Sequence, residues 1–162
     1  MDKLDRFRQA QDSPHAGYAA ALSELQAGEK TGHWIWYVFP QLAGLGQSST
    51  AVYYALSSVE EAAAYLRDRV LGSRLIATAA AVRAHLSGAG ARPVRLAGLM
   101  GSEIDARKLV SSMTLFGHVA KTLHAAEARP ELAAMAAHAD AILAAAAAQG
   151  YERCAFTEDR LR

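Results

Sequence analysis

Only one stretch of this 162-residue chain has the composition of a β-strand, and it has no second strand to pair with. Residues 33–40 read His-Trp-Ile-Trp-Tyr-Val-Phe-Pro, and aromatic and β-branched side chains of this kind favour strands. An isolated strand leaves its backbone N–H and C=O groups unpaired, which is costly in a protein interior. We therefore expect a short helix or an extended buried segment here, and no significant sheet.

The rest of the sequence favours helices. Alanine, the strongest helix former, supplies 37 of the 162 residues, and capping residues such as Ser58 and Ser102 precede several apolar stretches. The pattern predicts an all-α fold, a single compact multi-helix domain over residues 1–162 with about seven helices and an irregular C-terminal tail over residues 151–162. The helices are expected at residues 14–27, 48–56, 57–67, 70–86, 94–100, 102–129 (bent near Gly117) and 131–149.

Composition and charge exclude several classes of protein. A formal net charge of +1 argues against a nucleic-acid binder, and no apolar run approaches the roughly 20 residues that cross a bilayer. The single cysteine, Cys154, excludes an internal disulfide and a Cys-rich zinc site, and the six histidines show no metal-binding spacing. No phosphate-binding loop or dinucleotide fingerprint is present. We expect a cytoplasmic protein with no metal and no cofactor.

The aromatic residues gather in the segment 33–41. It contains five rings in seven residues, in a chain that is only 7% aromatic. In one interpretation this segment is a core plug around which helices pack. In the other it is a pocket wall, in which Trp34 or Trp36 stacks on a planar ligand and His33 or Gln41 forms a hydrogen bond with it. The two interpretations are compatible.

A second unusual segment lies about seventy residues further along the chain. Helical spacing places Lys108, Ser111 and Ser112 roughly on one side of a helix, where one ammonium and two hydroxyl groups can hold an anion. The alternative is structural, because serines within a helix often bond back to the carbonyl four residues earlier and let helices pack closely.

Together the two segments suggest three functions. In the first, Trp34, Trp36, Gln41, Lys108, Ser111 and Ser112 frame a pocket for a small planar anionic metabolite, such as a nucleotide. In the second, the protein is a hydrolase or transferase acting on an ADP-ribose-like or NAD-like substrate, with His33 as the acid–base group. In the third, it is an interaction or scaffold protein without a small-molecule site, whose Ala-rich helix over residues 131–149 pairs with a partner or a second copy.

The same segments resemble a known family. The run His33–Gln41, followed by Gly44-Leu45-Gly46, and the run Lys108–Phe116 are similar to the two motifs of a bacterial family named domain of unknown function 1810. The family's first motif usually reads HWMWFIFPQ, from which this chain departs only by apolar substitutions. The resemblance implies a compact all-helical fold and supplies no activity or catalytic residue. Some members carry the label calpastatin, but that inhibitor is extended and disordered, whereas this chain has a patterned core.

Overall fold

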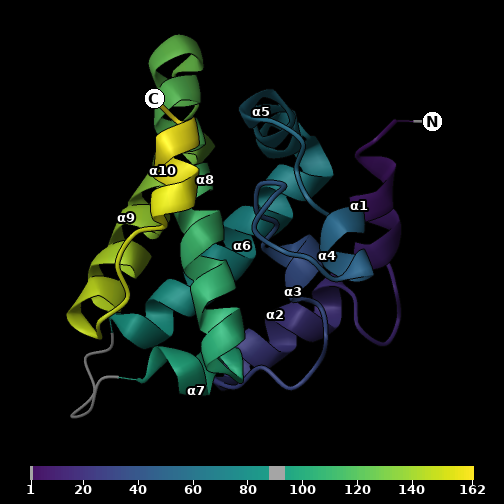
Figure 1. Ribbon diagram of the computed structural model, residues 1–162, viewed down its shortest axis with the longest axis vertical. Helices are drawn as coiled ribbons and strands as arrows, with labels where there is room; N and C mark the ends of the chain where they lie inside the picture. The colour runs from purple at the N-terminus through teal and green to yellow at the C-terminus, as the bar shows by residue number, and fades with distance from the viewer. Residues whose placement is uncertain (1, 88–93) are drawn as a thin grey trace.

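The computed structural model describes residues 2–87 and 94–162, and these residues form ten α-helices and no strand (Figure 1). The all-α class expected from the sequence is confirmed, whereas the expected number of about seven helices is too low. The described helices are α1 Asp5–Gln11, α2 Tyr18–Ala27, α3 Ile35–Val38, α4 Ser49–Tyr53, α5 Val59–Arg67, α6 Arg69–Leu86, α7 Leu96–Met100, α8 Glu103–Glu127, α9 Pro130–Ala148 and α10 Ala155–Arg160.

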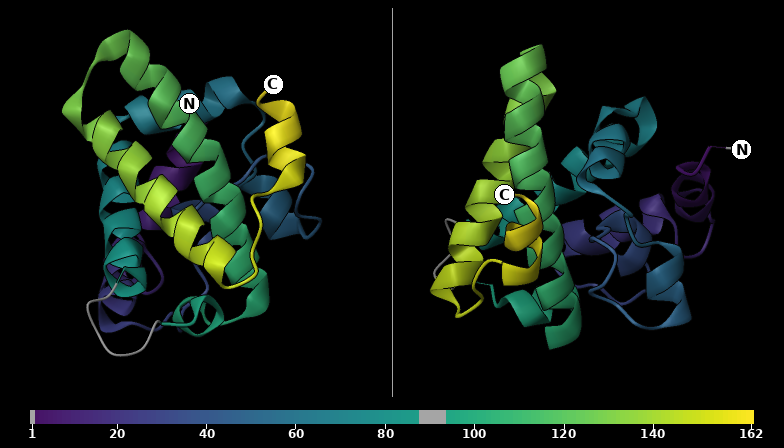
Figure 2. Two further views of the ribbon diagram at one scale, coloured as in Figure 1. Left: turned by 90° about the vertical axis from the view of Figure 1, so that its left-hand side faces the viewer. Right: turned by 45° about the horizontal axis from the view of Figure 1, so that its top comes forward.

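The long helix α8 is the centre of the fold. Its apolar side chains Leu109, Met113 and Phe116 are fully buried, and helices α5, α7, α9 and α10 all pack against it. The helix α9 follows after only two residues and runs antiparallel beside α8 (Figure 2), while α6 packs against both α9 and α2. One continuous apolar core therefore joins the N-terminal and C-terminal helices.

A glycine sets how closely α8 and α9 approach. A Cβ atom added at Gly117 would lie 3.0 Å from the Cβ atom of Ala139 on α9, closer than ordinary van der Waals contact. The sequence predicts a helix bent near Gly117, and α8 continues through this residue from Glu103 to Glu127. Gly117 is needed for close helix packing and does not interrupt the helix.

The aromatic segment forms the short helix α3, one of the two expected alternatives. The side chain of Gln11 donates a hydrogen bond to the Tyr37 carbonyl oxygen over 2.7 Å, and the Tyr37 hydroxyl group donates to the Ala16 carbonyl oxygen over 2.5 Å. Side chains thus satisfy backbone groups that a sheet would otherwise pair. The only bridge in the described residues joins Leu42 and Leu56.

Asp68 starts α6 and ties it to the N-terminus. One of its carboxylate oxygens accepts hydrogen bonds from the backbone amides of Val70 and Leu71, and the other accepts from the guanidinium group of Arg8. This carboxylate satisfies amides that every helix start leaves free. It also holds α1 against the junction of α5 and α6.

Two predicted boundaries are wrong. The second helix begins at Tyr18 instead of Pro14, because the chain turns tightly at Gly17, where a Cβ atom would lie 2.2 Å from the Ser13 carbonyl oxygen. The tail over residues 151–162 is irregular only as far as Cys154, after which α10 forms. A six-residue helix is too short for its sequence period to be recognised, and buried Thr157 fixes it against the core.

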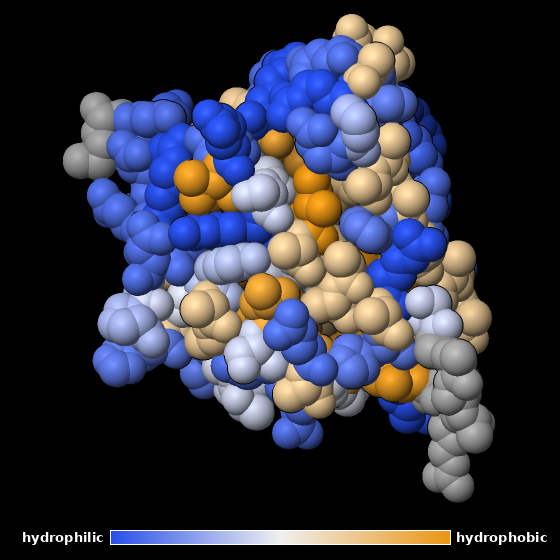
Figure 3. All heavy atoms as spheres, turned by 180° about the vertical axis from the view of Figure 1, so that it is seen from behind, coloured by the Kyte–Doolittle hydropathy of each residue, from blue (hydrophilic) through white to orange (hydrophobic). Residues whose placement is uncertain are grey.

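Among the described residues, only α9 is long and apolar enough by composition to cross a membrane. Its larger side chains Leu132, Met135 and Ile142 are buried against the rest of the fold, as in the core helix of a globular protein. The expectations of a cytoplasmic location and of self-association through this helix stay predictions. On the face shown in Figure 3, apolar residues reach the surface in small patches between polar ones, which is ordinary for a protein surface.

Candidate functional site

The two unusual sequence segments meet in the fold. The helix α3 packs on α8, and the Lys108 ammonium nitrogen lies 5.3 Å from the centroid of the Trp36 ring. A hollow of about 10 Å³ lies where they meet, which we call the junction hollow. It is lined by Ile35, Trp36, Phe39, Gln41, Ala51, Tyr54, Ala55 and Lys108.

The volume of the junction hollow limits what it can hold. A hollow of about 10 Å³ has room for one water-sized atom. Pockets for small molecules typically measure about 300–1,000 Å³. The segments are therefore neighbours, as the pocket hypothesis requires, but the space between them is far smaller than a nucleotide.

The other predicted pocket residues lie elsewhere. Trp34 is fully buried, and its indole N–H donates a hydrogen bond to the Glu24 carboxylate over 3.1 Å, so it serves as a core plug. Ser112 is fully buried and its hydroxyl oxygen has no partner among the described residues. Ser111 donates a hydrogen bond to the Arg107 carbonyl oxygen over 3.1 Å, the structural role considered for such serines.

His33, the candidate acid–base residue, is exposed and lines neither the junction hollow nor the larger hollows described below. Its carbonyl oxygen accepts a hydrogen bond from the Tyr37 hydroxyl group over 3.3 Å. Its imidazole ring has no hydrogen-bond or ion-pair partner within residues 2–87 and 94–162.

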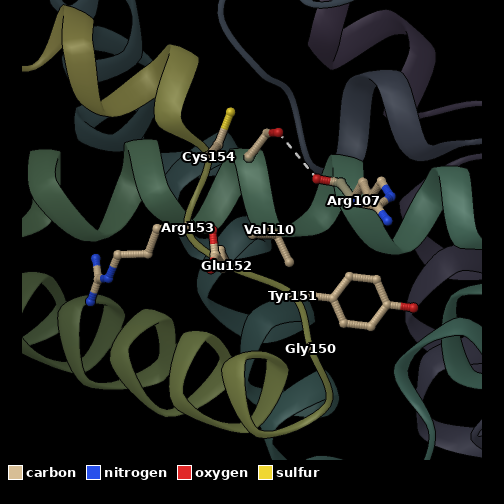
Figure 4. A pocket seen from close by; sticks show the side chains of 8 residues that line it. Arg107, Val110, Gly150, Tyr151, Glu152, Arg153 and Cys154 are labelled. Atoms are coloured by element: carbon tan, nitrogen blue, oxygen red, sulfur yellow. Dashed lines mark hydrogen bonds between the residues drawn. The ribbon is translucent and has the colours of Figure 1, made fainter.

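The space for a ligand lies on a different face. Two adjoining hollows of about 440 and 450 Å³ share Arg107, Gly150 and Tyr151, and we call them together the arginine groove. The groove runs between the first half of α8, the start of α7 and the segment that connects α9 to α10 (Figure 4). The remaining lining residues are Arg95, Ala97, Glu103, Val110, Ser111, Gln149, Glu152, Arg153 and Cys154.

A glutamine holds two walls of the groove together. The Gln149 side chain accepts a hydrogen bond from the Leu96 amide and donates one to the Val94 carbonyl oxygen, each over 2.8 Å. The chain then turns at Gly150, whose φ of +94° would be strained in any residue other than glycine. Tyr151 follows, nearly buried, and its hydroxyl group donates to Glu103 over 2.7 Å.

The groove contains cations that are not neutralised. Within the described residues, neither Arg95 nor Arg107 forms an ion pair with a carboxylate, and the Arg107 guanidinium lies 5.6 Å from the centroid of the Tyr151 ring. Arg153 extends to the opposite side of the groove (Figure 4), toward Asp140 at 3.9 Å. The hydrogen bond to Glu103 raises the pKa of the Tyr151 hydroxyl group, so this group stays neutral at physiological pH.

Two other surface hollows, of about 410 and 370 Å³, are less positive. One arginine in each is paired, Arg6 with Glu61 over 3.2 Å and Arg129 with Glu131 over 2.7 Å. Each then keeps one cation without an ion pair in the described residues, Lys3 or Arg69. The arginine groove is therefore the better candidate for holding an anion.

Sequence reasoning did not find the arginine groove because its parts carry no common motif. Arg107 stands beside Lys108 in the second unusual segment, but the helix turns the two side chains in different directions. Tyr151 lies in a stretch that the sequence predicts as an irregular tail. The available signal was one aromatic residue directly after the glycine that ends a helix.

No group of three or more histidine, cysteine, aspartate or glutamate side chains is arranged to bind a metal ion in residues 2–87 and 94–162. The only cysteine there, Cys154, is half-buried and accepts a hydrogen bond from the Thr157 hydroxyl group over 3.2 Å. The groove thus offers guanidinium, hydroxyl and aromatic groups as its means of binding.

Comparison with known proteins gives two matches. The model of a family described as "protein of unknown function (DUF1810)" matches residues 1–146. The chain is similar to the crystal structure of the conserved hypothetical protein Rv1873 from Mycobacterium tuberculosis, with 38% identity and a TM-score of 0.75, over 97% of this chain and 94% of that one. No curated protein matches the chain.

Proposed function

This chain belongs to the DUF1810 family of proteins of unknown function, so we propose a function from its geometry: it binds a small planar anionic metabolite, such as a nucleotide, in the arginine groove. The observation that carries the proposal is the pair Arg95 and Arg107, two guanidinium groups without a carboxylate partner in the described residues, beside hollows of about 440 and 450 Å³.

The chemistry of arginine supports an anionic ligand. A guanidinium group stays charged at any physiological pH and donates two parallel hydrogen bonds to a phosphate or carboxylate group. A planar ring system also stacks on a guanidinium plane, as the Tyr151 ring packs near Arg107 here. The groove can therefore serve both parts of a nucleotide-like molecule.

The volume decides between the two places where such a ligand was considered. The junction hollow of about 10 Å³ cannot admit a metabolite, whereas each part of the arginine groove lies within the usual size range. The hydrolase or transferase alternative placed its acid–base group at His33, which lies outside the groove. We therefore propose ligand binding as the function and assign no catalytic residue.

Titration calorimetry at low salt with AMP, ADP-ribose, NAD and inorganic phosphate tests the proposal. We expect at least one nucleotide to bind, and we expect Arg107→Gln to weaken it by roughly tenfold to a hundredfold, since hydrogen bonds to charged groups contribute about 1.5–3 kcal/mol each. Arg162→Gln is the matched control, because it removes the same charge from a side chain that is 80% exposed and outside the groove.

Equal weakening by Arg107→Gln and Arg162→Gln would show attraction by net charge alone and would refute a specific site. Failure of all four compounds to release heat or raise the melting temperature would refute the proposed ligand class. Adding salt should weaken true binding only moderately, since the groove is partly enclosed by the protein.

A further inference from the structure

The junction hollow contains a buried donor without an acceptor. The indole Nε1 atom of Trp36 is buried and has no hydrogen-bond partner among the described residues. More than nine in ten buried polar groups in proteins do have a partner, and an indole N–H can only donate. An acceptor at this place is therefore missing from the protein's own side chains.

A second donor lines the same hollow. Lys108 is half-buried, its ammonium nitrogen lies 5.3 Å from the Trp36 ring centroid, and it forms no ion pair or hydrogen bond within residues 2–87 and 94–162. Gln41, also in the lining, has a side-chain amide without a described partner. Residues that carry an ammonium group, an indole N–H and an amide thus line one small hollow.

The chain contains the same lysine–tryptophan pair a second time, with its donors occupied. Lys30 lies 4.9 Å from the Trp34 ring centroid, but its ammonium group pairs with the Asp105 carboxylate at 2.8 Å. The Trp34 indole N–H donates to the Glu24 carboxylate. The pair of Lys30 and Trp34 thus contacts two carboxylates, whereas the pair of Lys108 and Trp36 contacts none in the described residues.

From this difference we propose that the junction hollow binds one small monovalent anion, with chloride as the physiological occupant. A site of about 10 Å³ fits a single atom of roughly the size of water. Gln41 and Tyr54 carry oxygen acceptors in the same lining, but the Lys108 ammonium group is its only charge, and a cation beside the Trp36 indole N–H favours an anion over neutral water. The apolar walls of Ile35, Phe39 and Ala51 lower the local dielectric and strengthen the attraction between Lys108 and the anion.

Thermal melts at constant ionic strength test the proposal, with sodium chloride or bromide compared with sodium gluconate, whose anion is too large for the hollow. Bound chloride stabilises the folded protein, and we expect the melting temperature to rise by roughly 3–6 °C when the free anion is at about ten times its dissociation constant. Lys108→Gln and Trp36→Phe should each remove the difference between chloride and gluconate. Lys121→Gln, which removes an exposed ammonium on the same helix, should leave it unchanged.

The comparison of two salts within each variant separates binding from folding, because a variant that is merely less stable still shows any general effect of chloride on proteins. Crystals soaked in sodium bromide give an independent readout, an anomalous peak between Trp36 and Lys108. A chloride effect of equal size in all three variants, or no such peak, would overturn the proposal. A rise of the melting temperature with formate or phosphate but not with chloride would also overturn the proposal. It would show that the site accepts an oxygen atom of a larger ligand.

Discussion

Replacing each tryptophan by alanine tests how the aromatic segment is divided between core and surface. Trp34 is fully buried, with 0% of its surface exposed to solvent. Truncation of such a side chain costs about 3–5 kcal/mol. It also removes one of the hydrogen bonds to Glu24, which keeps those from the amides of Thr31 and Gly32, so this loss adds at most about 1 kcal/mol. We expect Trp34→Ala to lower the free energy of unfolding by about 4–5 kcal/mol.

Trp36 is only partly buried against the core. Less apolar area is removed from water at this residue than at fully buried Trp34, so we expect Trp36→Ala to cost less, roughly 2 kcal/mol. In a buffer without chloride, Trp36→Ala should cost less stability, because the indole N–H of the original protein then has no contact with an anion to lose.

Urea unfolding followed by helix circular dichroism measures both values without relying on tryptophan fluorescence. With a slope of about 2 kcal/mol per molar urea, the midpoint should fall by roughly 2 M for Trp34→Ala and 1 M for Trp36→Ala. If Trp36→Ala destabilises the protein as much as Trp34→Ala does, the assignment of one ring to the core and the other to the rim is refuted.

Three further outcomes are expected. Burial by itself raises the pKa of Asp68, but the hydrogen bonds from Arg8 and from the amides at the start of α6 outweigh it and hold the pKa below its ordinary value. The stability that Asp68 contributes is therefore present above about pH 4 and is lost as the pH falls below it. Asp68→Asn should make the urea midpoint less dependent on pH between pH 5 and 3. Burial and the nearby charge of Arg83 lower the pKa of His138, so the protein should lose stability as the pH falls below about 6.5, and NMR titration should show a higher His138 pKa in Arg83→Gln. Gly117→Leu should cost about 1–3 kcal/mol in urea unfolding by forcing α8 from α9, and a near-neutral result would contradict the close packing there.

Local patterns were sufficient to predict the fold class and several helix starts. Ser58 and Ser102 accept hydrogen bonds from the amides three residues later, as the capping patterns indicate. The absence of a partner strand left a short helix or an extended buried segment as the alternatives, and the structure has the short helix. The boundaries at Tyr18 and Ala155 were missed, because they depend on a tight turn and on packing with distant residues.

The candidate site was less accessible from the sequence. The meeting of Trp36 with Lys108 follows from the two unusual segments, but the volume between them depends on every side chain that lines it, such as Phe39 and Tyr54. The arginine groove depends on the Gln149 clamp, which joins residues more than fifty positions apart. No local pattern contains that information.

The Gln149 clamp also bears on which part of the groove lies within the match to the family model. Its wall of the groove begins at residue 149, three positions beyond residue 146, where the match to the family model ends. Substitution of the exposed residues Glu152 and Arg153 would change the wall of the groove opposite Arg107, while buried Tyr151 and Thr157 keep this segment attached to the core. Under the proposed function, ligand preference would change at these exposed positions and not at the buried ones.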